Sequence, residues 1–249
     1  MKADGPVEPV VSDAPAEAPR SRTRPKIGKW LAAALLVVAA ALVVYVFVSP
    51  DWYVWDLDVS GARWLSDEEV VNVTGIVGTS IFYVEPARVT ASLSALASVE
   101  RVRVTCRLPN RISIYLVERE PAAIWQSQGT QYWVDLAGTL FPRAADLPDP
   151  VVIVEQDNVA RRPGDRVNAD ALATALELHG QLPAARIFGY SLTEGLSFDL
   201  PSGERVLAPA QADVSRKLAS LQAVQQYLKA ESIAHKVIDL RYTGRAFWR

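Results

Sequence analysis

The pattern of hydrophobic positions begins with one long apolar run, residues 30–48, which contains no charged residue, glycine or proline. At about 1.5 Å of rise per residue, a helix of this length spans roughly 28 Å, close to a hydrocarbon core of about 30 Å. The run therefore predicts a transmembrane helix. A cleaved signal peptide is the alternative, because Ala39-Ala40-Ala41 resembles a cleavage site. The run, however, exceeds the roughly 7–15 apolar residues of such a peptide.

Charge is distributed unevenly around this run. Residues 1–29 carry six basic and four acidic side chains, whereas residues 49–62 contain no Lys or Arg. The positive-inside rule therefore predicts a cytoplasmic N-terminus and an extracytoplasmic C-terminal part. Residues 1–29 also contain five prolines and no apolar periodicity, which is typical of a disordered tail. Aromatic residues flank the run at the positions of the two interfacial belts: Trp30, Tyr45, Trp52 and Tyr53.

Beyond the run, residues 53–121 predict a small α+β domain with the order strand, helix, helix, strand, strand. The first strand alternates from Trp55 to Ser60 and places Trp55 inward together with two aliphatic residues. The first helix begins at the capping box of Ser66 and Glu69. The second begins near Pro86, which suits a first helical turn. Residues 102–106 and 112–116 alternate on either side of a Pro-Asn turn and predict a hairpin.

Two features of this domain concern its surface. The apolar pair Ile81-Phe82 is expected to lie underneath the domain, whereas four arginines on the hairpin are expected on its solvent side: Arg101, Arg103, Arg107 and Arg111. These arginines either form a solvated strand face or a contact surface for an acidic partner or lipid headgroups.

Residues 122–249 predict a second domain that is mostly β with two helices. Helices are expected over 168–180 and 212–229, where apolar residues recur at helical spacing. Alternating or continuous apolar segments between turn residues predict strands at 122–125, 132–135, 138–141, 151–154, 187–192, 196–200, 205–207 and 236–242. Trp125, Trp133 and Phe141 are expected in the core rather than on a ligand platform.

The composition and the missing motifs exclude several classes of function. The net charge is −2 and no region is strongly basic, which argues against a nucleic-acid partner. Cys106 is the single cysteine, so neither an intrachain disulfide nor a cysteine metal cluster is possible. The sequence carries no Gly-x-Ser-x-Gly, Ser-x-x-Lys, phosphate-cradling glycine loop or His-Glu-x-x-His motif. His179 and His235 have no carboxylate motif beside them and are expected to be packing or surface residues. We therefore expect a non-enzymatic protein without a cofactor.

The last predicted strand, residues 236–242, is a candidate binding edge. A terminal strand that pairs on one side leaves free backbone N–H and C=O groups, which a partner strand can occupy. Alternation places Asp239 and Arg241 on one face and three apolar residues on the other: Ile238, Leu240 and Tyr242. Phe247 and Trp248 follow and add rigid aromatic surface of the kind that carries interface energy. The alternative is that these aromatic residues close the core.

The ordered set of motifs resembles a known family. The motifs are Val59-x-Gly61, Ser66-x-Glu68-Glu69-Val70, Gly75-Ile76, Ser80-Ile81-Phe82, Leu96-x-x-Val99, Arg107-Leu108-Pro109-Asn110, Glu118-Arg119-x-Pro121-x-Ala123-x-Trp125, Val134-Asp135-x-x-Gly138-x-x-Phe141 and Ile238-Asp239-Leu240-Arg241-Tyr242. Together with one transmembrane helix, they are similar to the bacterial cell-division family FtsQ, also called DivIB. The resemblance covers roughly residues 27–249.

The resemblance implies a POTRA domain over 53–121 and the family's β domain over 122–249. It also implies a bitopic scaffold of the division septum in the inner membrane, which binds FtsB and FtsL and acts through them on the septal peptidoglycan synthases FtsW and FtsI. The FtsB contact would involve positions matching Tyr242 and Trp248, and the POTRA face would receive an upstream division protein. A POTRA-containing export factor is the alternative, but the two amphipathic helices after Pro121 do not suit a transmembrane barrel. A membrane-anchored hydrolase would need the missing motifs.

Overall fold

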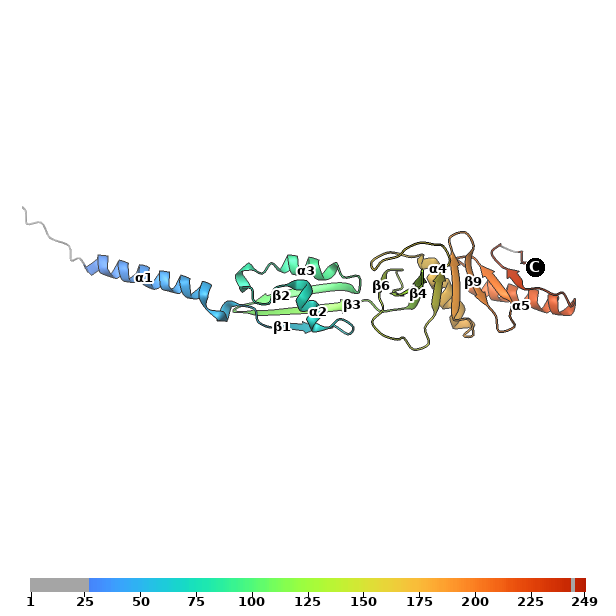
Figure 1. Ribbon diagram of the computed structural model, residues 1–249, viewed down its shortest axis with the longest axis horizontal. Helices are drawn as coiled ribbons and strands as arrows, with labels where there is room; N and C mark the ends of the chain where they lie inside the picture. Colours follow the sequence, from blue (N-terminus) through green and yellow to red (C-terminus); the bar gives the residue numbers. More distant parts are fainter. Residues whose placement is uncertain (1–26, 243–244) are drawn as a thin grey trace, which may run out of the picture. The chain divides into compact units, whose positions relative to one another are not determined.

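The computed structural model describes residues 27–242 and 245–249, so nearly all of the predicted tail 1–29 lies outside the described residues. The first element is helix α1, Ile27–Val48 (Figure 1). It begins three residues before the predicted start at 30 and ends at the predicted residue. Within the described part of the chain, the span Gly28–Val48 is the one helix long and apolar enough to cross a membrane. Its apolar stretch is not buried against the rest of the protein.

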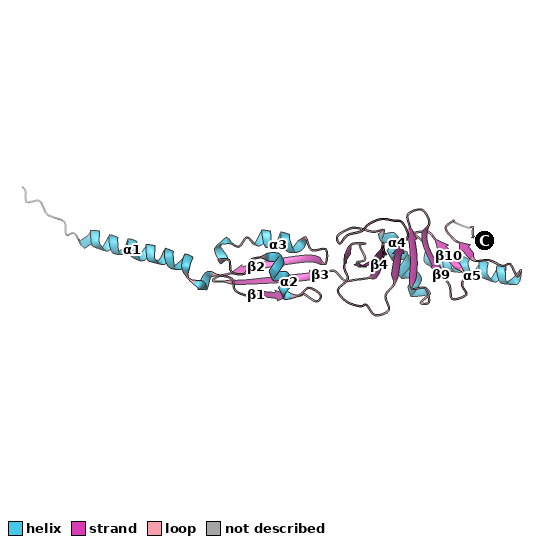
Figure 2. Cartoon of the chain, viewed as in Figure 1, coloured by secondary structure: helices cyan, strands magenta, loops and turns pink. Residues whose placement is uncertain are grey.

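The next elements form a small sheet covered by two helices (Figure 2). The order strand, helix, helix, strand, strand is confirmed by β1 (Leu57–Ser60), α2 (Asp67–Thr74), α3 (Pro86–Ser94), β2 (Val99–Arg107) and β3 (Arg111–Glu118). Two short 3₁₀ helices, η1 (Pro50–Trp52) and η2 (Ile81–Tyr83), lie before β1 and before α3. The strand order is β1-β3-β2, with β3 parallel to β1 and antiparallel to β2.

Local capping explains the two helices. The Ser66 hydroxyl accepts a hydrogen bond from the Glu69 backbone N–H at 3.2 Å, as a capping box requires. Gly75 ends α2 in the left-handed region with φ 60°, which glycine adopts without steric cost. Pro86 occupies the first turn of α3. The helices bury one face of the sheet in a cluster that includes Val70, Val89, Leu93, Ile112, Ile114 and Leu116.

Two expectations about this domain are wrong. Trp55 does not face inward: β1 begins at Leu57, and the Trp55 side chain is 62% exposed, with its indole N–H bonded to the Pro50 carbonyl at 3.3 Å. The residues just before β1 pair irregularly with Thr79 and Ser80, so the strand alternation does not extend back to Trp55. Phe82 is 47% exposed although its neighbour Ile81 is buried, because a 3₁₀ turn directs consecutive side chains to different sides.

The remaining elements form a large sheet with two helices. Its strands follow the order β12-β11-β10-β9-β8-β7-β4-β5-β6. The element bounds are β4 (Ala123–Ser127), β5 (Thr130–Val134), β6 (Leu140–Pro142), β7 (Val152–Glu155), α4 (Ala169–Gln181), β8 (Ile187–Ser191), β9 (Gly195–Asp199), β10 (Arg205–Ala208), α5 (Val214–Ala230), β11 (Val237–Asp239) and β12 (Phe247–Trp248). The fold is thus α+β, with a mostly β second part, as predicted.

The main core of the large sheet lies between its strands and the two helices. Leu172 of α4 and Leu221 of α5 belong to the same buried cluster as Trp125, Phe188 and Ile238. Trp133 and Phe141 are also buried, but they belong to a separate cluster with Ile124. The core positions expected for Trp125, Trp133 and Phe141 are therefore confirmed.

A buried carboxylate of the large sheet, Glu155 in β7, pairs with Arg161 of the following loop. The Glu155 side chain is 0% exposed and accepts hydrogen bonds from Arg161 at 2.6 and 3.1 Å. The Trp125 indole N–H donates to the same carboxylate at 3.2 Å. The Tyr132 hydroxyl donates to the Arg161 carbonyl at 2.8 Å and fixes the loop that carries the arginine. The hydrogen bond that Arg161 donates to Glu155 raises the pKa of Arg161.

The last residue of β3, Glu118, and the next residue, Arg119, organise the junction between the small and large sheets. The Glu118 carboxylate accepts the backbone N–H groups of Trp64 and Leu65, each at 2.8 Å. Arg119 donates to the Ala97 carbonyl at 3.0 Å and to Asp135 at 2.7 Å. The Trp64 ring also packs against the buried Trp133 cluster, with ring centroids 4.9 Å apart.

Candidate functional site

The edge of the large sheet is β12, which lies beyond the strand predicted to be the edge. The prediction for 236–242 is therefore wrong in two respects: strand β11 covers Val237–Asp239 alone, and it has neighbours on both sides. The backbone N–H of Arg241 donates to the Asp239 carboxylate at 3.0 Å. Such a side-chain turn competes with strand pairing and ends the strand there. The next described strand, β12, pairs with β11 in antiparallel direction.

The register of β12 leaves one residue's backbone directed outward. Val237 and Arg249 exchange two hydrogen bonds, at 3.0 and 3.1 Å. The next opposed pair is Ile238 and Trp248. Because hydrogen-bonded and non-hydrogen-bonded pairs alternate in an antiparallel ladder, the N–H and C=O of Trp248 point away from β11. Among the described residues, no strand pairs with that outer side.

Exposed aromatic rings surround this edge. Phe247 is opposite Asp239, whereas Trp248 is opposite the buried Ile238, so their side chains lie on different faces of the sheet. Trp248 packs against Tyr227 of α5, with centroids 5.8 Å apart, and Phe247 packs against Tyr242 at 5.4 Å. All four rings remain 40–55% exposed. The edge therefore presents aromatic surface on both faces.

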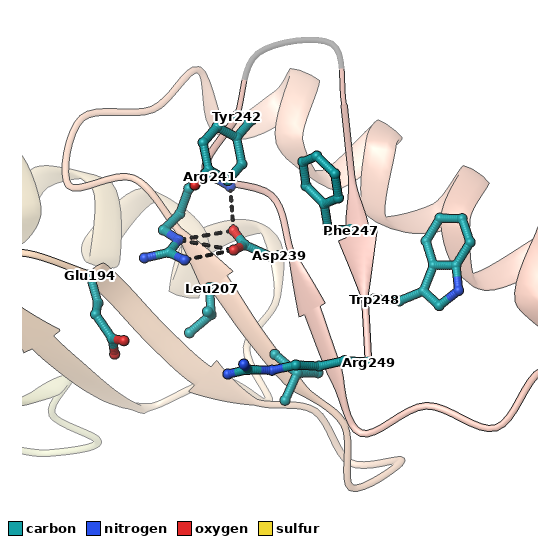
Figure 3. A pocket seen from close by; sticks show the side chains of 9 residues that line it. Glu194, Leu207, Asp239, Arg241, Tyr242, Phe247, Trp248 and Arg249 are labelled. Atoms are coloured by element: carbon teal, nitrogen blue, oxygen red, sulfur yellow. Dashed lines mark hydrogen bonds and ion pairs between the residues drawn. The ribbon is translucent and has the colours of Figure 1, made fainter.

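An ion pair lies beside Phe247 in an open pocket of about 380 Å³ (Figure 3). Arg241 donates to both carboxylate oxygens of Asp239, with Nη2 to Oδ2 at 2.7 Å and Nε to Oδ1 at 3.0 Å. The hydrogen bond from Arg241 lowers the pKa of Asp239, and the carboxylate in turn raises the pKa of Arg241. Glu194 and Arg249 line the same pocket. The pocket thus combines an apolar wall with charges of both signs.

Lys217 fixes the segment that carries Tyr242. Its ammonium group donates to the Leu240 carbonyl and, at 3.1 Å, to the Tyr242 carbonyl. This contact orients the chain where it leaves the large sheet. The position of Tyr242 is thereby set by α5 as well as by β11.

The predicted site residues separate into three groups. Arg241, Tyr242, Phe247 and Trp248 come together at the edge, and all of them have accessible surface. Ile238 and Leu240 are 0% and 3% exposed and belong to the core, so they support the edge from beneath. Arg103 and Arg107 lie on the exposed face of the small sheet, as expected. Tyr242 is exposed and does not share the core face of Ile238, contrary to the predicted alternation.

Sequence reasoning missed the contributions of α5 to this edge. Tyr227 and Lys217 lie 21 and 25 residues before Trp248 and Tyr242, and their contacts depend on how α5 packs. The one sequence signal for this contribution is Tyr227 itself, a tyrosine on the polar side of an amphipathic helix.

His235 is a packing residue, as expected, although the Glu204 carboxylate lies 2.9 Å from its Nε2. Gln225 donates to the other Glu204 oxygen at 2.9 Å, and this bond is the main reason that the pKa of Glu204 is lowered. The three side chains join the β9–β10 turn, α5 and the segment before β11. Ser202 also hydrogen-bonds to Glu204 and contributes to its lowered pKa. The arrangement ties these three segments together.

The Asp239–Arg241 pair predicts a pH-dependent stability. Asp239→Asn should lower the free energy of unfolding by about 1 kcal/mol at pH 7, because the charged carboxylate is bonded to Arg241. The pKa of Asp239 is lowered in the folded state, so its stabilising effect is present above the unfolded pKa of about 3.9. The difference between variant and wild type should therefore shrink as the pH falls below about 4. Urea titrations at pH 7 and pH 3 measure this difference in the free energy of unfolding. Asp199→Asn is the control, because Asp199 belongs to an exposed ion pair.

Comparisons with known proteins agree with this architecture. Residues 54–119 match the family model "POTRA domain, FtsQ-type", and residues 123–241 match "Cell division protein FtsQ/DivIB, C-terminal". The chain is 32% identical over 230 residues to the cell division protein FtsQ of Chloroflexus aurantiacus, covering 89% of this chain and 83% of that protein. The chain belongs to the FtsQ/DivIB family. The FtsQ of Chloroflexus aggregans is 31% identical over 222 residues, covering 86% of this chain and 80% of that protein.

Family membership assigns the chain to bacterial cell division and identifies the small-sheet region as a POTRA domain. Helix α1 provides single-pass membrane anchoring, in agreement with its length and apolar composition. The C-terminal family match ends at residue 241. The aromatic residues of the edge, Tyr242, Phe247 and Trp248, therefore follow the matched region.

Proposed function

We propose that this protein is a non-enzymatic bitopic scaffold of the divisome and that β12 is its docking edge for FtsB and FtsL. Through these partners it would help to control septal peptidoglycan synthesis by FtsW and FtsI. The observation that carries the proposal is the outward-directed backbone of Trp248, flanked by exposed aromatic rings. The identity of the partners comes from the family resemblance.

The proposed docking mode follows from the chemistry of the edge. A partner strand that pairs with β12 would satisfy the Trp248 N–H and C=O and extend the large sheet by one strand. Its side chains would alternate between the Tyr227–Trp248 face and the pocket beside Phe247. On the pocket side, Arg249 and Glu194 offer charges of opposite sign. Main-chain hydrogen bonds would supply affinity, and the two aromatic faces would select side chains.

The proposed topology assigns each region a compartment. Residues 1–29 would form the cytoplasmic tail and residues 30–48 the membrane span, followed outside the inner membrane by a POTRA domain over 53–121 and a β domain over 122–249. The charge asymmetry around the span supports this orientation. Protease added to spheroplasts should digest the chain after about residue 52 and spare a tag at Met1. Loss of the tag would contradict the orientation.

The docking edge is tested by Tyr242→Glu and Trp248→Glu, made singly. Each should weaken co-purification with FtsB by about 30-fold, since an aromatic hot spot contributes about 2 kcal/mol and the new charge would be desolvated. Thermal unfolding should change little, because both rings are half exposed. Tyr115→Glu, at an exposed tyrosine of the small sheet, is the matched control and should retain binding. Full binding by Tyr242→Glu and Trp248→Glu would refute docking at this edge.

A second surface, the exposed face of the POTRA sheet, is proposed to receive an upstream division protein. Arg103 and Arg107 lie on this face of β2, with the exposed Tyr115 beside Arg103 on β3. Reversing both arginines to Glu should leave folding intact, because exposed charges contribute little to stability. Midcell recruitment, measured by fluorescence of a tagged chain, should fall several-fold. The double reversal Arg162→Glu with Arg166→Glu, at two exposed arginines of the second domain, is the charge-matched control. Unchanged recruitment of the Arg103 and Arg107 double variant would show a merely solvated face.

A further inference from the structure

Exposed apolar side chains gather at one end of the POTRA domain. Strand β3 starts at Arg111 and runs parallel to β1, with Ile112 beside Leu57. The tip of the β2–β3 hairpin, residues 108–110, therefore lies at the end of the sheet where β1 begins (Figure 1). The segment just before β1 is at this end too, and Val54 N–H bonds to the Thr79 carbonyl at 3.0 Å. Helix η2 follows two residues after Thr79.

We call this surface the basal end and define it by Trp55, Phe82, Tyr83, Leu108 and Arg111. The four apolar side chains are 62%, 47%, 67% and 66% exposed. Within residues 54–119, the large exposed hydrophobic side chains are these four with Val77 and Tyr115. Val77 lies at this end as well, because the N–H of its neighbour Gly78 bonds to the Val54 carbonyl. Tyr115 is opposite Arg103 on the hairpin, so it is the one residue of this set that lies away from the basal end. The concentration distinguishes the basal end from single apolar residues scattered over an ordinary surface.

The opposite end of the POTRA sheet is already occupied. Glu118 at the end of β3 bonds to Trp64 and Leu65, and Trp64 packs on the Trp133 cluster of the large sheet. The basal end has no comparable contact with the large sheet among the described residues, since no cluster joins the two. At the basal end itself, the Phe82 ring packs on Trp52, with centroids 5.2 Å apart.

We propose that the basal end rests in the headgroup region of the membrane that α1 spans. Helix α1 ends at Val48, and Trp52 follows after four residues, a separation that an extended chain limits to roughly 14 Å. The start of the POTRA domain is thus tethered at the membrane surface by its covalent connection. This proposal does not depend on the partner proposed for β12.

The chemistry of the basal end fits that location. Trp and Tyr favour the membrane–water interface because their rings are apolar and carry one polar group. Leu108 stands at the hairpin tip, and the arginines at its base, Arg107 and Arg111, are opposite one another and exposed. Guanidinium groups in this position would pair with lipid phosphates. Exposed acids also lie beside this end, at Asp51, Asp56 and Glu85, and they would have to remain on the aqueous side of the phosphates.

The test uses the full chain in nanodiscs of phosphatidylcholine and phosphatidylglycerol. In a Cys106→Ser background, Leu108→Cys is labelled with the fluorophore NBD, and Tyr115→Cys serves as an exposed control in the same domain. Lipids with a doxyl quencher near the headgroup report insertion, and aqueous iodide reports water access. We expect at least threefold stronger lipid quenching at 108 than at 115, with iodide quenching reduced to the same degree. Adding Trp55→Ser and Tyr83→Ser to the labelled Leu108→Cys variant should remove most of that difference.

Two results would overturn the proposal. A probe at 108 that is quenched by lipid no more than the probe at 115 would show that the basal end does not reach the headgroups. A probe that is quenched by lipid but stays fully open to iodide would show proximity through the tether without insertion. Arg111→Glu should reduce lipid quenching more strongly in nanodiscs that contain phosphatidylglycerol, whose headgroup carries a net negative charge, than in pure phosphatidylcholine. Equal loss in pure phosphatidylcholine, with an unchanged far-UV circular dichroism spectrum, would contradict the pairing of Arg111 with anionic headgroups.

Discussion

Arg161→Ala is expected to lower the free energy of unfolding by about 3–5 kcal/mol, because it leaves the fully buried Glu155 carboxylate without its cation. Arg161 donates two hydrogen bonds to that carboxylate, and the remaining donor, the Trp125 indole, cannot neutralise the charge. For a domain of this size the loss corresponds to a fall in Tm of roughly 10 °C. Differential scanning calorimetry of the purified chain measures it.

Two further variants separate burial from simple charge pairing. Arg205→Ala breaks a pair with Asp199 in which both side chains are more than half exposed, and it should cost less than about 1 kcal/mol. The double variant Glu155→Leu with Arg161→Leu should recover part of the loss, because it removes the buried charge along with its partner. If Arg161→Ala is no more destabilising than Arg205→Ala, the carboxylate is not isolated from solvent as described.

Glu118→Ala is expected to cost about 3 kcal/mol. The substitution leaves the backbone N–H groups of Trp64 and Leu65 without the acceptor that each now bonds at 2.8 Å. An unsatisfied buried donor costs about 1–3 kcal/mol, and Leu65 in particular is buried. Amide hydrogen exchange should accelerate first over residues 61–66, since these residues lose their anchor to β3.

Glu120→Ala is the control for this substitution, because Glu120 is exposed and carries the same charge two residues later. Its effect should stay within about 0.5 kcal/mol. Equal effects of the two alanine substitutions, or unchanged exchange over 61–66 in Glu118→Ala, would show that the carboxylate does not hold this loop.

The parts of the fold that were predictable from sequence are those set by local chemistry. The capping box at Ser66, the stop at Gly75 and the proline at the start of α3 each act within one helical turn, and all three are as predicted. Helix α1 follows from uninterrupted apolar composition. By contrast, the exposure of Trp55 depends on pairing with Thr79 and Ser80, more than twenty residues away. Periodicity within one strand does not contain that information.

The candidate site was partly predictable for a similar reason. The aromatic composition near Tyr242, Phe247 and Trp248 indicated an exposed binding surface, and these residues do gather at one edge. The position of that edge was wrong, because Asp239 bonds to the Arg241 backbone and ends β11 early. The stacking of Tyr227 on Trp248 depends on the packing of α5 against the large sheet. Neither contact leaves a periodic signal in the sequence.

Strand addition at β12 is tested most directly by comparing Trp248→Pro with Trp248→Ala in binding to the extracytoplasmic segment of FtsB. Both substitutions remove the indole, but only proline also removes the N–H that points away from β11. The hydrogen bonds between Val237 and Arg249 do not involve this group, so Tm should be similar in the two variants. We expect the proline variant to bind about tenfold more weakly than the alanine variant, because the partner's carbonyl loses its donor. Equal affinity of the two variants at equal stability would contradict docking by strand addition.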